Sequence, residues 1–180
     1  MEKLTMKELN RMTVEEFKSA DKVPIVIVLD NIRSQNNIGS VFRTADSFRL
    51  QSVFLCGITA TPPHREIHKT ALGATETMDW KYFPDTVDAL HLLKSQGYNI
   101  VAVEQTHRSI FLPDFFPPPK TSLALIFGNE VNGIDENILR LCETILEIPQ
   151  SGTKHSLNIS VAVGIVIWDI ISRGNFQGIL

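Results

Sequence analysis

Apolar runs alternate along the chain with segments whose hydrophobic residues recur at helical spacing. The run "PIVIVLD" has the continuous β-branched composition of a strand that is buried on both faces. Runs of this kind predict strands over 24–30, 52–57, 77–83, 99–105, 122–128 and 143–149. Helical patterns cover 36–48, 85–95, 135–142 and 156–173. This order predicts an α/β fold with a mostly parallel sheet and helices on both faces.

Residues that suit helix ends stand where these patterns begin and stop. An N-cap side chain accepts a hydrogen bond from a free backbone N–H, which favours Asn, Asp, Ser and Thr. The candidate caps are Asn36 or Asn37, Asp85 or Thr86, Asp135, and Ser156 or Asn158, and Gly97 can end the second helix. Thr5 with Glu8 and Thr13 with Glu16 fit the capping-box pattern. We therefore expect a short helical extension over 1–20, followed by one domain over 21–180.

Length, composition and charge narrow the class of protein. A chain of 180 residues, 43% hydrophobic and 21% charged, is typical of one globular domain. No apolar run is long enough to cross a membrane and the first residues lack the apolar core of a signal peptide, so we expect a cytoplasmic protein. The net charge of −3 argues against coating nucleic acid through bulk positive charge, but it permits a local basic patch. Cys56 and Cys142 lie in apolar surroundings and are interpreted as buried, reduced thiols.

Polar residues follow four of the predicted strands. Ligands of open parallel sheets bind beyond the carboxyl ends of the strands, so these loops are candidates for one site. The loops hold Asn31, Arg33, Asn36, Asn37 and Gly39 after the first strand, Glu104 and Gln105 after the fourth, "GNEVNG" at 128–133 and "PQSGTKHSLN" at 149–158. Their glycines, amides and hydroxyls suit a small polar ligand. The last two loops also fit plain connections, a strand-to-helix turn and a helix cap.

The stretch "NNIGSVFRTADSF", residues 36–48, carries Arg43 one turn after Gly39 on the same helix face. Free N–H groups at a helix start favour an anion, and the guanidinium of Arg43 can return toward a phosphate or a ribose oxygen. The alternative is an ordinary amphipathic helix with a solvated arginine.

Histidines at positions 64 and 68 raise the question of a metal site. His64 and His68 lack an HExxH pattern, so no metal site is predicted. Arg65 and Lys69 lie beside them, which favours a basic surface patch that can meet phosphate. Further basic residues that could extend this patch are Lys81, Arg108 and Lys120.

The last helical pattern, over 156–173, is apolar on nearly every side. A helix that is apolar all round must be covered all round. The sheet would cover one face, and a partner subunit could cover the other. The alternative is a buried strand, which the length of the pattern disfavours.

Three stretches together identify a family. "NNIGSVFRTADSF", "LIFGNEVNGI" and "IPQSGTKHSLNISVAVG" resemble, in order and spacing, the three motifs of the SpoU/TrmH family of RNA ribose 2′-O-methyltransferases, within the SPOUT superfamily. The likeness covers residues 24–172, and "HKTALGA" at 68–74 is also typical of the family. The resemblance implies a C-terminal trefoil knot, a homodimer with the last helix at its interface, and S-adenosylmethionine as methyl donor. The hydrophobic pattern by itself does not predict the knot, because chain connections ordinarily avoid one.

The resemblance also implies which residues act. The catalytic set would be Arg43, Asn37, Glu130, Ser156 and Asn158, and the cofactor would lie near Glu104, Gln105, Gly128, Asn129, Ile148, Ser156 and Leu157. Asn37 would orient Arg43 or the ribose. In the family, the matching arginine is thought to accept the proton of the ribose hydroxyl. A guanidinium is normally protonated already, so we expect instead that Arg43 stays charged and stabilises the developing alkoxide.

The implied reaction is methyl transfer to a ribose 2′-hydroxyl of tRNA or rRNA, which makes the substrate RNA and not DNA. Substrate contacts are expected from residues 1–20, the basic patch and the partner subunit. The alternatives are a non-catalytic RNA-binding relative that keeps the fold, and a small-ligand-binding α/β domain.

Overall fold

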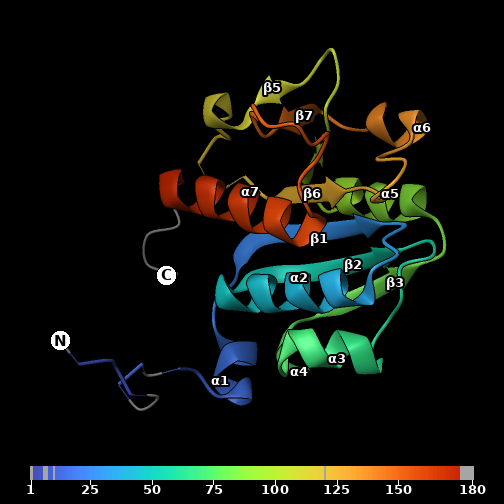
Figure 1. Cartoon of the computed structure of the whole chain (residues 1–180). Coiled ribbons are helices and arrows are strands. Elements are labelled where there is room, and N and C mark those ends of the chain that lie inside the picture. The colour runs from blue at the N-terminus through green and yellow to red at the C-terminus, as the bar shows by residue number, and fades with distance from the viewer. Residues whose placement is uncertain (1, 6–7, 10, 120, 175–180) are drawn as a thin grey trace.

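The structure is a computed structural model that describes residues 2–5, 8–9, 11–119 and 121–174. A seven-stranded sheet has the strand order β3-β2-β1-β6-β4-β7-β5 (Figure 1). Neighbouring strands run parallel throughout this sheet. The strands are β1 Val23–Asp30, β2 Leu50–Cys56, β3 Trp80–Phe83, β4 Asn99–Val103, β5 Ile110–Phe111, β6 Leu123–Phe127 and β7 Thr144–Glu147.

Helices cover both faces of the sheet, and alternate residues of β1 show the division. Ile25, Ile27 and Leu29 face one apolar cluster, and Val26 and Val28 face the other. The helices of the first cluster are α1 Val14–Ser19, α2 Gln35–Ser47, α3 Arg65–Ala71, α4 Ala74–Thr77 and α7 Ile159–Arg173. Those of the second are α5 Thr86–Ser95 and α6 Glu136–Leu139. In Figure 1, α2 runs between α7 on one side and the α3–α4 pair on the other.

This architecture confirms the predicted α/β class, the parallel sheet and the helices on both faces. Several boundaries were wrong. Residues 77–79 are not part of a strand, because Thr77 closes α4 and β3 begins at Trp80. The helix expected over 135–142 ends at Leu139, and the last helix begins at Ile159. Helices α3 and α4 and the two-residue strand β5 were not predicted. The trefoil knot and the domain boundary at residue 20 stay predictions.

The amino-terminal segment is less helical than expected. Thr13 and Glu16 complete the capping box, and α1 follows from it. Phe17 of α1 is only 5% exposed and packs into the main core, so this helix is anchored to the domain. Glu8 accepts hydrogen bonds from the backbone N and the Oγ1 of Thr5, but within the described residues before 13 the contact supports a turn and not a helix.

Two further expectations concern membranes and thiols. None of the helices in the described part of the chain combines the length and the apolar character that a membrane span needs. Cys56 and Cys142 are both free, the first buried and the second half-buried. Burial raises the pKa of each thiol to about 12, which keeps both in the unreactive protonated form at neutral pH.

Candidate active site

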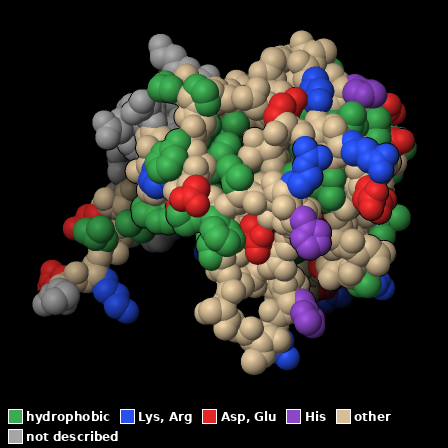
Figure 2. Space-filling view, turned by 90° about the horizontal axis from the view of Figure 1, so that it is seen from above, with side chains coloured by type: hydrophobic (Ala, Val, Ile, Leu, Met, Phe, Trp, Pro, Cys, Tyr) green, Lys and Arg blue, Asp and Glu red, His purple; other side chains and the backbone are tan. Residues whose placement is uncertain are grey.

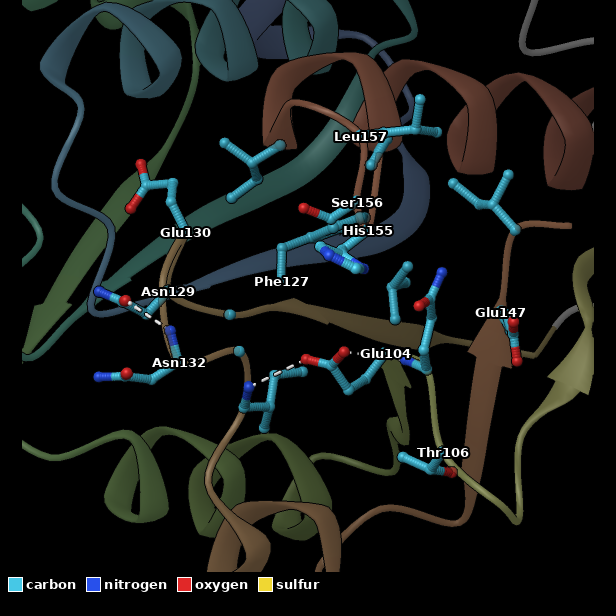
Figure 3. Close-up of a pocket in the computed structure, with 18 of the residues that line it drawn as sticks. Glu104, Thr106, Phe127, Asn129, Glu130, Asn132, Glu147, His155, Ser156 and Leu157 are labelled. Atoms are coloured by element: carbon cyan, nitrogen blue, oxygen red, sulfur yellow. Dashed lines mark hydrogen bonds between the residues drawn. The ribbon is translucent and has the colours of Figure 1, made fainter. Parts of the chain in front are cut away.

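A cavity of about 680 Å³ lies beyond the carboxyl ends of β4, β6 and β7 (Figure 3). The loops that follow these three strands line it, together with the first turn of α7. Its walls include the predicted residues Glu104, Gln105, Gly128, Asn129, Glu130, Ile148, Ser156, Leu157 and Asn158. The sheet therefore brings together side chains that lie more than fifty positions apart in the sequence.

The turn after β6 is closed by its own hydrogen bonds. Asn129 and Gly133 exchange backbone hydrogen bonds at 2.9 and 3.1 Å. The Oδ1 of Asn129 accepts from the N–H groups of Val131 and Asn132 at 2.9 and 3.1 Å. A Cβ at Gly128 would lie only 2.5 Å from the carbonyl carbon of Gly133, so this position requires glycine. Because these N–H groups are already used, the turn is a rigid wall and not a phosphate loop.

Glu104 ties the end of β4 to this turn. Its Oε1 accepts from the N–H of Gln105 at 2.9 Å, and its Oε2 accepts from the N–H of Ile134 at 3.1 Å (Figure 3). A Cβ at Gly133 would lie 2.3 Å from Oε2, so the carboxylate packs directly on the glycine. Hydrogen bonds from backbone N–H groups to a carboxylate are among the stronger ones, and here they fix the width of the cavity.

Glu130 connects the same turn to the start of α2. In Figure 3 its carboxylate lies on the other side of the turn from Glu104. It accepts hydrogen bonds from the backbone N–H groups of Arg33 and Ser34 at 3.1 and 3.2 Å. Burial opposes ionisation of this carboxyl, but hydrogen bonds from Arg33, its own backbone, Ser34 and the Asn37 side chain outweigh that effect and hold its pKa below the ordinary value. The ionised side chain is thus a strut between two loops.

The start of α2 differs from the expectation. Ser34 is the N-cap, and its Oγ accepts from the N–H of Asn37 at 3.3 Å, so the predicted cap at Asn36 or Asn37 is wrong. The helix begins at Gln35 because the Glu130 strut already fixes the two residues before it. Gly39 serves helix packing, since a Cβ there would lie 2.1 Å from Oγ1 of Thr70 in α3.

Asn37 does not line the cavity itself, but it is hydrogen-bonded to Asn158, which does. The Nδ2 of Asn158 donates to Oδ1 of Asn37 at 3.2 Å, and the Oδ1 of Asn158 accepts from the N–H of Ser160 at 2.9 Å. Asn158 is therefore the N-cap of α7, one of the two residues predicted for that position, and it joins α7 to α2. The predicted residue Ser156 lies at the cavity mouth beside His155 (Figure 3).

Arg43 is the one predicted catalytic residue that neither lines the cavity nor is hydrogen-bonded to a residue that does, within the described part of this chain. It is exposed, and it is absent from the described residues that line the cavity. Six residues after Asn37, it lies on the solvent side of α2, while Asn37 points toward α7. Several wall residues were not predicted from the sequence, among them Thr106, Ile134, Leu139, Glu147, Ile159 and Ala162. Thr106 directly follows Gln105 and could have been found, whereas Leu139 reaches the cavity through the placement of α6.

The predicted basic patch is divided. Lys81 lies on the edge strand β3, and Arg108 precedes β5 at the opposite edge, so these two side chains cannot share one patch. Lys120 lies outside the described residues. Figure 2 shows Lys and Arg interspersed with Asp and Glu on the face seen from above. His64 caps α3 through Nδ1, and among the described residues no group of three or more His, Cys, Asp or Glu side chains is placed to bind a metal ion.

Known proteins resemble this chain over most of its length. The model of the SpoU rRNA Methylase family matches residues 24–168. The 23S rRNA (guanosine-2′-O-)-methyltransferase RlmB of Vibrio vulnificus is 29% identical over 170 residues, which cover 93% of this chain and 66% of that protein. The chain thus spans slightly less than two thirds of this relative.

Solved structures share the fold. A crystal structure of an AdoMet-bound rRNA methyltransferase from Sinorhizobium meliloti has a TM-score of 0.76 at 24% identity, over 87% of this chain and 58% of that one. A structure described for the 2-OH methylation of C/U34 on tRNA has a TM-score of 0.71 at 24% identity, over 83% of this chain and 96% of that one.

Proposed function

Since the chain belongs to the SpoU rRNA Methylase family, we propose that it transfers a methyl group from S-adenosylmethionine to a ribose 2′-hydroxyl of tRNA or rRNA. The observation that carries this proposal is the cavity at the carboxyl edge of the sheet. Loops from three strands converge on it, and a volume of about 680 Å³ suits a ligand of nucleoside size.

The lining of the cavity fits S-adenosylmethionine. Val103, Ile148 and Leu157 offer apolar surface to a flat base, and the loops at 104–106 and 155–158 offer polar groups to a ribose and an amino acid. When bound, this group supplies a methyl carbon on a positively charged sulfur. The chain's part is alignment: the Glu104 and Asn129 hydrogen bonds hold the walls at fixed separation, and such positioning can contribute about 7–11 kcal/mol when it is complete.

Arg43 is proposed to hold a substrate phosphate and to stabilise negative charge that develops on the ribose oxygen. A guanidinium stays charged at accessible pH, so the hydroxyl proton passes to a substrate phosphate or another group and not to Arg43. Arg43 is exposed and lies outside the cavity lining described for its own chain, so we propose that it serves the cavity of a partner subunit.

An apolar stripe on α7 supports a homodimer. Val161, Ile165 and Trp168 are 49%, 38% and 61% exposed, and their spacing puts them on one side of the helix. Trp168 also contacts Phe48, which follows α2, with ring centroids 6.2 Å apart. A second copy that covers the stripe would therefore meet α2, the helix of Arg43. Light scattering should give the mass of a dimer, and Trp168→Glu should give a monomer.

A methyl-transfer assay tests the proposed function. Protein is incubated with tritium-labelled S-adenosylmethionine and total RNA, and the labelled positions are mapped. Label in 2′-O-methyl ribose is expected, and a matched 2′-deoxy substrate should stay unlabelled. RNA binding without transfer would identify a non-catalytic relative. Absence of salt-dependent RNA binding would favour a small-ligand-binding domain.

A further inference from the structure

The turn between α3 and α4 holds a leucine in an unfavourable conformation. Leu72 has φ +50° and ψ +45°, the left-handed region, and Gly73 follows with φ +90°. At the end of a helix this conformation is usually occupied by glycine, since a Cβ costs about 1 kcal/mol there. The Leu72 side chain gains little burial in return, because the residue is 66% exposed. The fold therefore gives no reason for leucine at this position.

Two basic residues of α3 precede this exposed leucine on the same helix. Arg65 and Lys69 of α3 lie 3.9 Å from opposite oxygens of one carboxylate, Glu66, and their side chains are 95% and 72% exposed. Ion pairs this long and this exposed contribute little, so both cations are available to another anion. His68 lies one turn before Leu72, whose N–H donates to the His68 carbonyl at 3.2 Å. On α3 two cations face one carboxylate, so this helix carries a net positive charge, and the exposed Glu76 follows on α4.

Arg43 lies along the same surface. Three residues of α2 contact the α3–α4 pair: Asn36 accepts from Thr70, Gly39 packs on Thr70, and Asp46 accepts from Thr77. Positions 36, 39, 43 and 46 fall on one stripe of a helix with 3.6 residues per turn. Arg43 is therefore exposed at the edge of the α2 face that contacts the α3–α4 pair, between the contacts at Thr70 and Thr77.

We propose that Leu72, Arg65 and Lys69 form an RNA contact beside Arg43, in which the Leu72 side chain packs against an unstacked base next to the methylated nucleotide. This inference rests on the proposed function. Apolar side chains that pack against or between bases are a common way to hold a nucleotide out of its stack. Single-stranded RNA presents such bases, and its phosphates match the two cations. The strain at Leu72 is then a cost of presenting the side chain to the ligand.

Substitution of Leu72 separates a binding role from a structural role. Leu72→Gly removes the side chain and relieves the backbone, so the melting temperature should stay the same or rise by about 2–4 °C. Affinity for a fluorescently labelled single-stranded RNA of mixed sequence should fall on the order of tenfold. Leu72→Met should keep the affinity of the wild-type protein. Lys69→Gln should reduce the slope of affinity against salt by about one.

Controls identify which idea fails. Phe116→Gly, which removes an exposed apolar side chain elsewhere, should leave RNA affinity unchanged. Wild-type affinity in Leu72→Gly, or a change of its oligomeric mass that accounts for the loss, overturns the proposed contact. If the wild-type protein binds RNA but transfers no methyl group, the proposed function fails while the Leu72 contact is still judged by the affinities. If it binds no RNA, both fail.

Discussion

Arg43 is the residue on which the proposed chemistry depends most. Its proposed contacts are a substrate phosphate and the reacting ribose oxygen and not the cofactor, so Arg43→Ala should leave S-adenosylmethionine affinity unchanged. Loss of a preorganised charge that acts in the transition state should lower the rate of transfer by about 10²–10³. Calorimetry with the cofactor and a tritium transfer assay would measure the two effects separately.

Two matched variants sharpen this test. Arg43→Lys should fail nearly as badly, because lysine cannot offer two parallel donors to a phosphate. Arg140→Ala removes an arginine of α6 that pairs with Glu136 at 3.0 Å, and it should retain full activity. A parallel collapse of cofactor affinity and activity in Arg43→Ala would contradict the assigned role.

Glu130 predicts a pH dependence of stability. Its pKa in the folded protein lies below the ordinary value of 4.5, so its contribution is fully present above that pH and is lost as the pH falls through the lowered pKa. Glu130→Gln should therefore destabilise the protein at pH 7, by about 1 kcal/mol for a solvent-screened carboxylate with two backbone hydrogen bonds. Urea unfolding of both proteins from pH 7 to pH 3 would measure the difference.

The difference between the two proteins should shrink at the acid end of this range, because the Gln side chain does not titrate. Glu136→Gln offers a control, since Glu136 is exposed on α6 and pairs only with Arg140 in the described structure. A constant difference between wild type and Glu130→Gln at every pH would mean that the carboxylate charge is irrelevant to the strut.

At the scale of elements, the cap of α2 gives a test of where that helix begins. Ser34→Ala removes the hydroxyl that accepts from Asn37 and should cost about 1 kcal/mol. Asn36→Ala leaves the backbone carbonyl that accepts from Thr70 and should be nearly neutral. Thermal unfolding should give a lower melting temperature for Ser34→Ala than for Asn36→Ala. A lower melting temperature for Asn36→Ala would instead support the cap at Asn36 that was expected from the sequence.

The elements that were predicted correctly are those whose burial is uniform along the chain. β1 and β6 lie at the centre of the sheet, so their residues are nearly all apolar and the pattern is continuous. α3 and α4 contain seven and four residues, too few to show a helical period. Their stability comes from packing on α2 at Gly39 and Asp46, which a sequence pattern does not display.

In the candidate site, too, local sequence patterns predicted some residues, and tertiary packing determined the rest. Residues of the loops after β4, β6 and β7 were predicted because the carboxyl ends of parallel strands meet at one edge. Their partners could not be predicted in this way. Arg33 and Glu130 are 97 positions apart, and Asn37 and Asn158 are 121 apart. These hydrogen bonds therefore depend on how the fold brings distant loops to the same edge of the sheet. Arg43 was placed in the site by its motif, which carries no information on which subunit's cavity it serves.

At the scale of the whole molecule, the arrangement of two subunits decides how Arg43 meets a cavity. In one chain, α2 has Asn37 toward α7 and Arg43 on the solvent side, next to the α3–α4 turn. A two-fold dimer through α7 would bring α2 of one subunit to the other, since Phe48 contacts Trp168 in the exposed stripe. Each active site would then need both subunits.

Mixed dimers test this arrangement directly. Arg43→Ala keeps an intact cavity, while Leu157→Trp fills the cavity but keeps Arg43, and each homodimer should be inactive. After the two are unfolded together and refolded, half of the dimers should be mixed, and one of their two sites should have both an open cavity and an arginine. Transfer should therefore recover to about a quarter of the wild-type rate if Arg43 acts across the interface. If Arg43 serves its own chain, neither site of a mixed dimer is complete and the mixture should stay inactive.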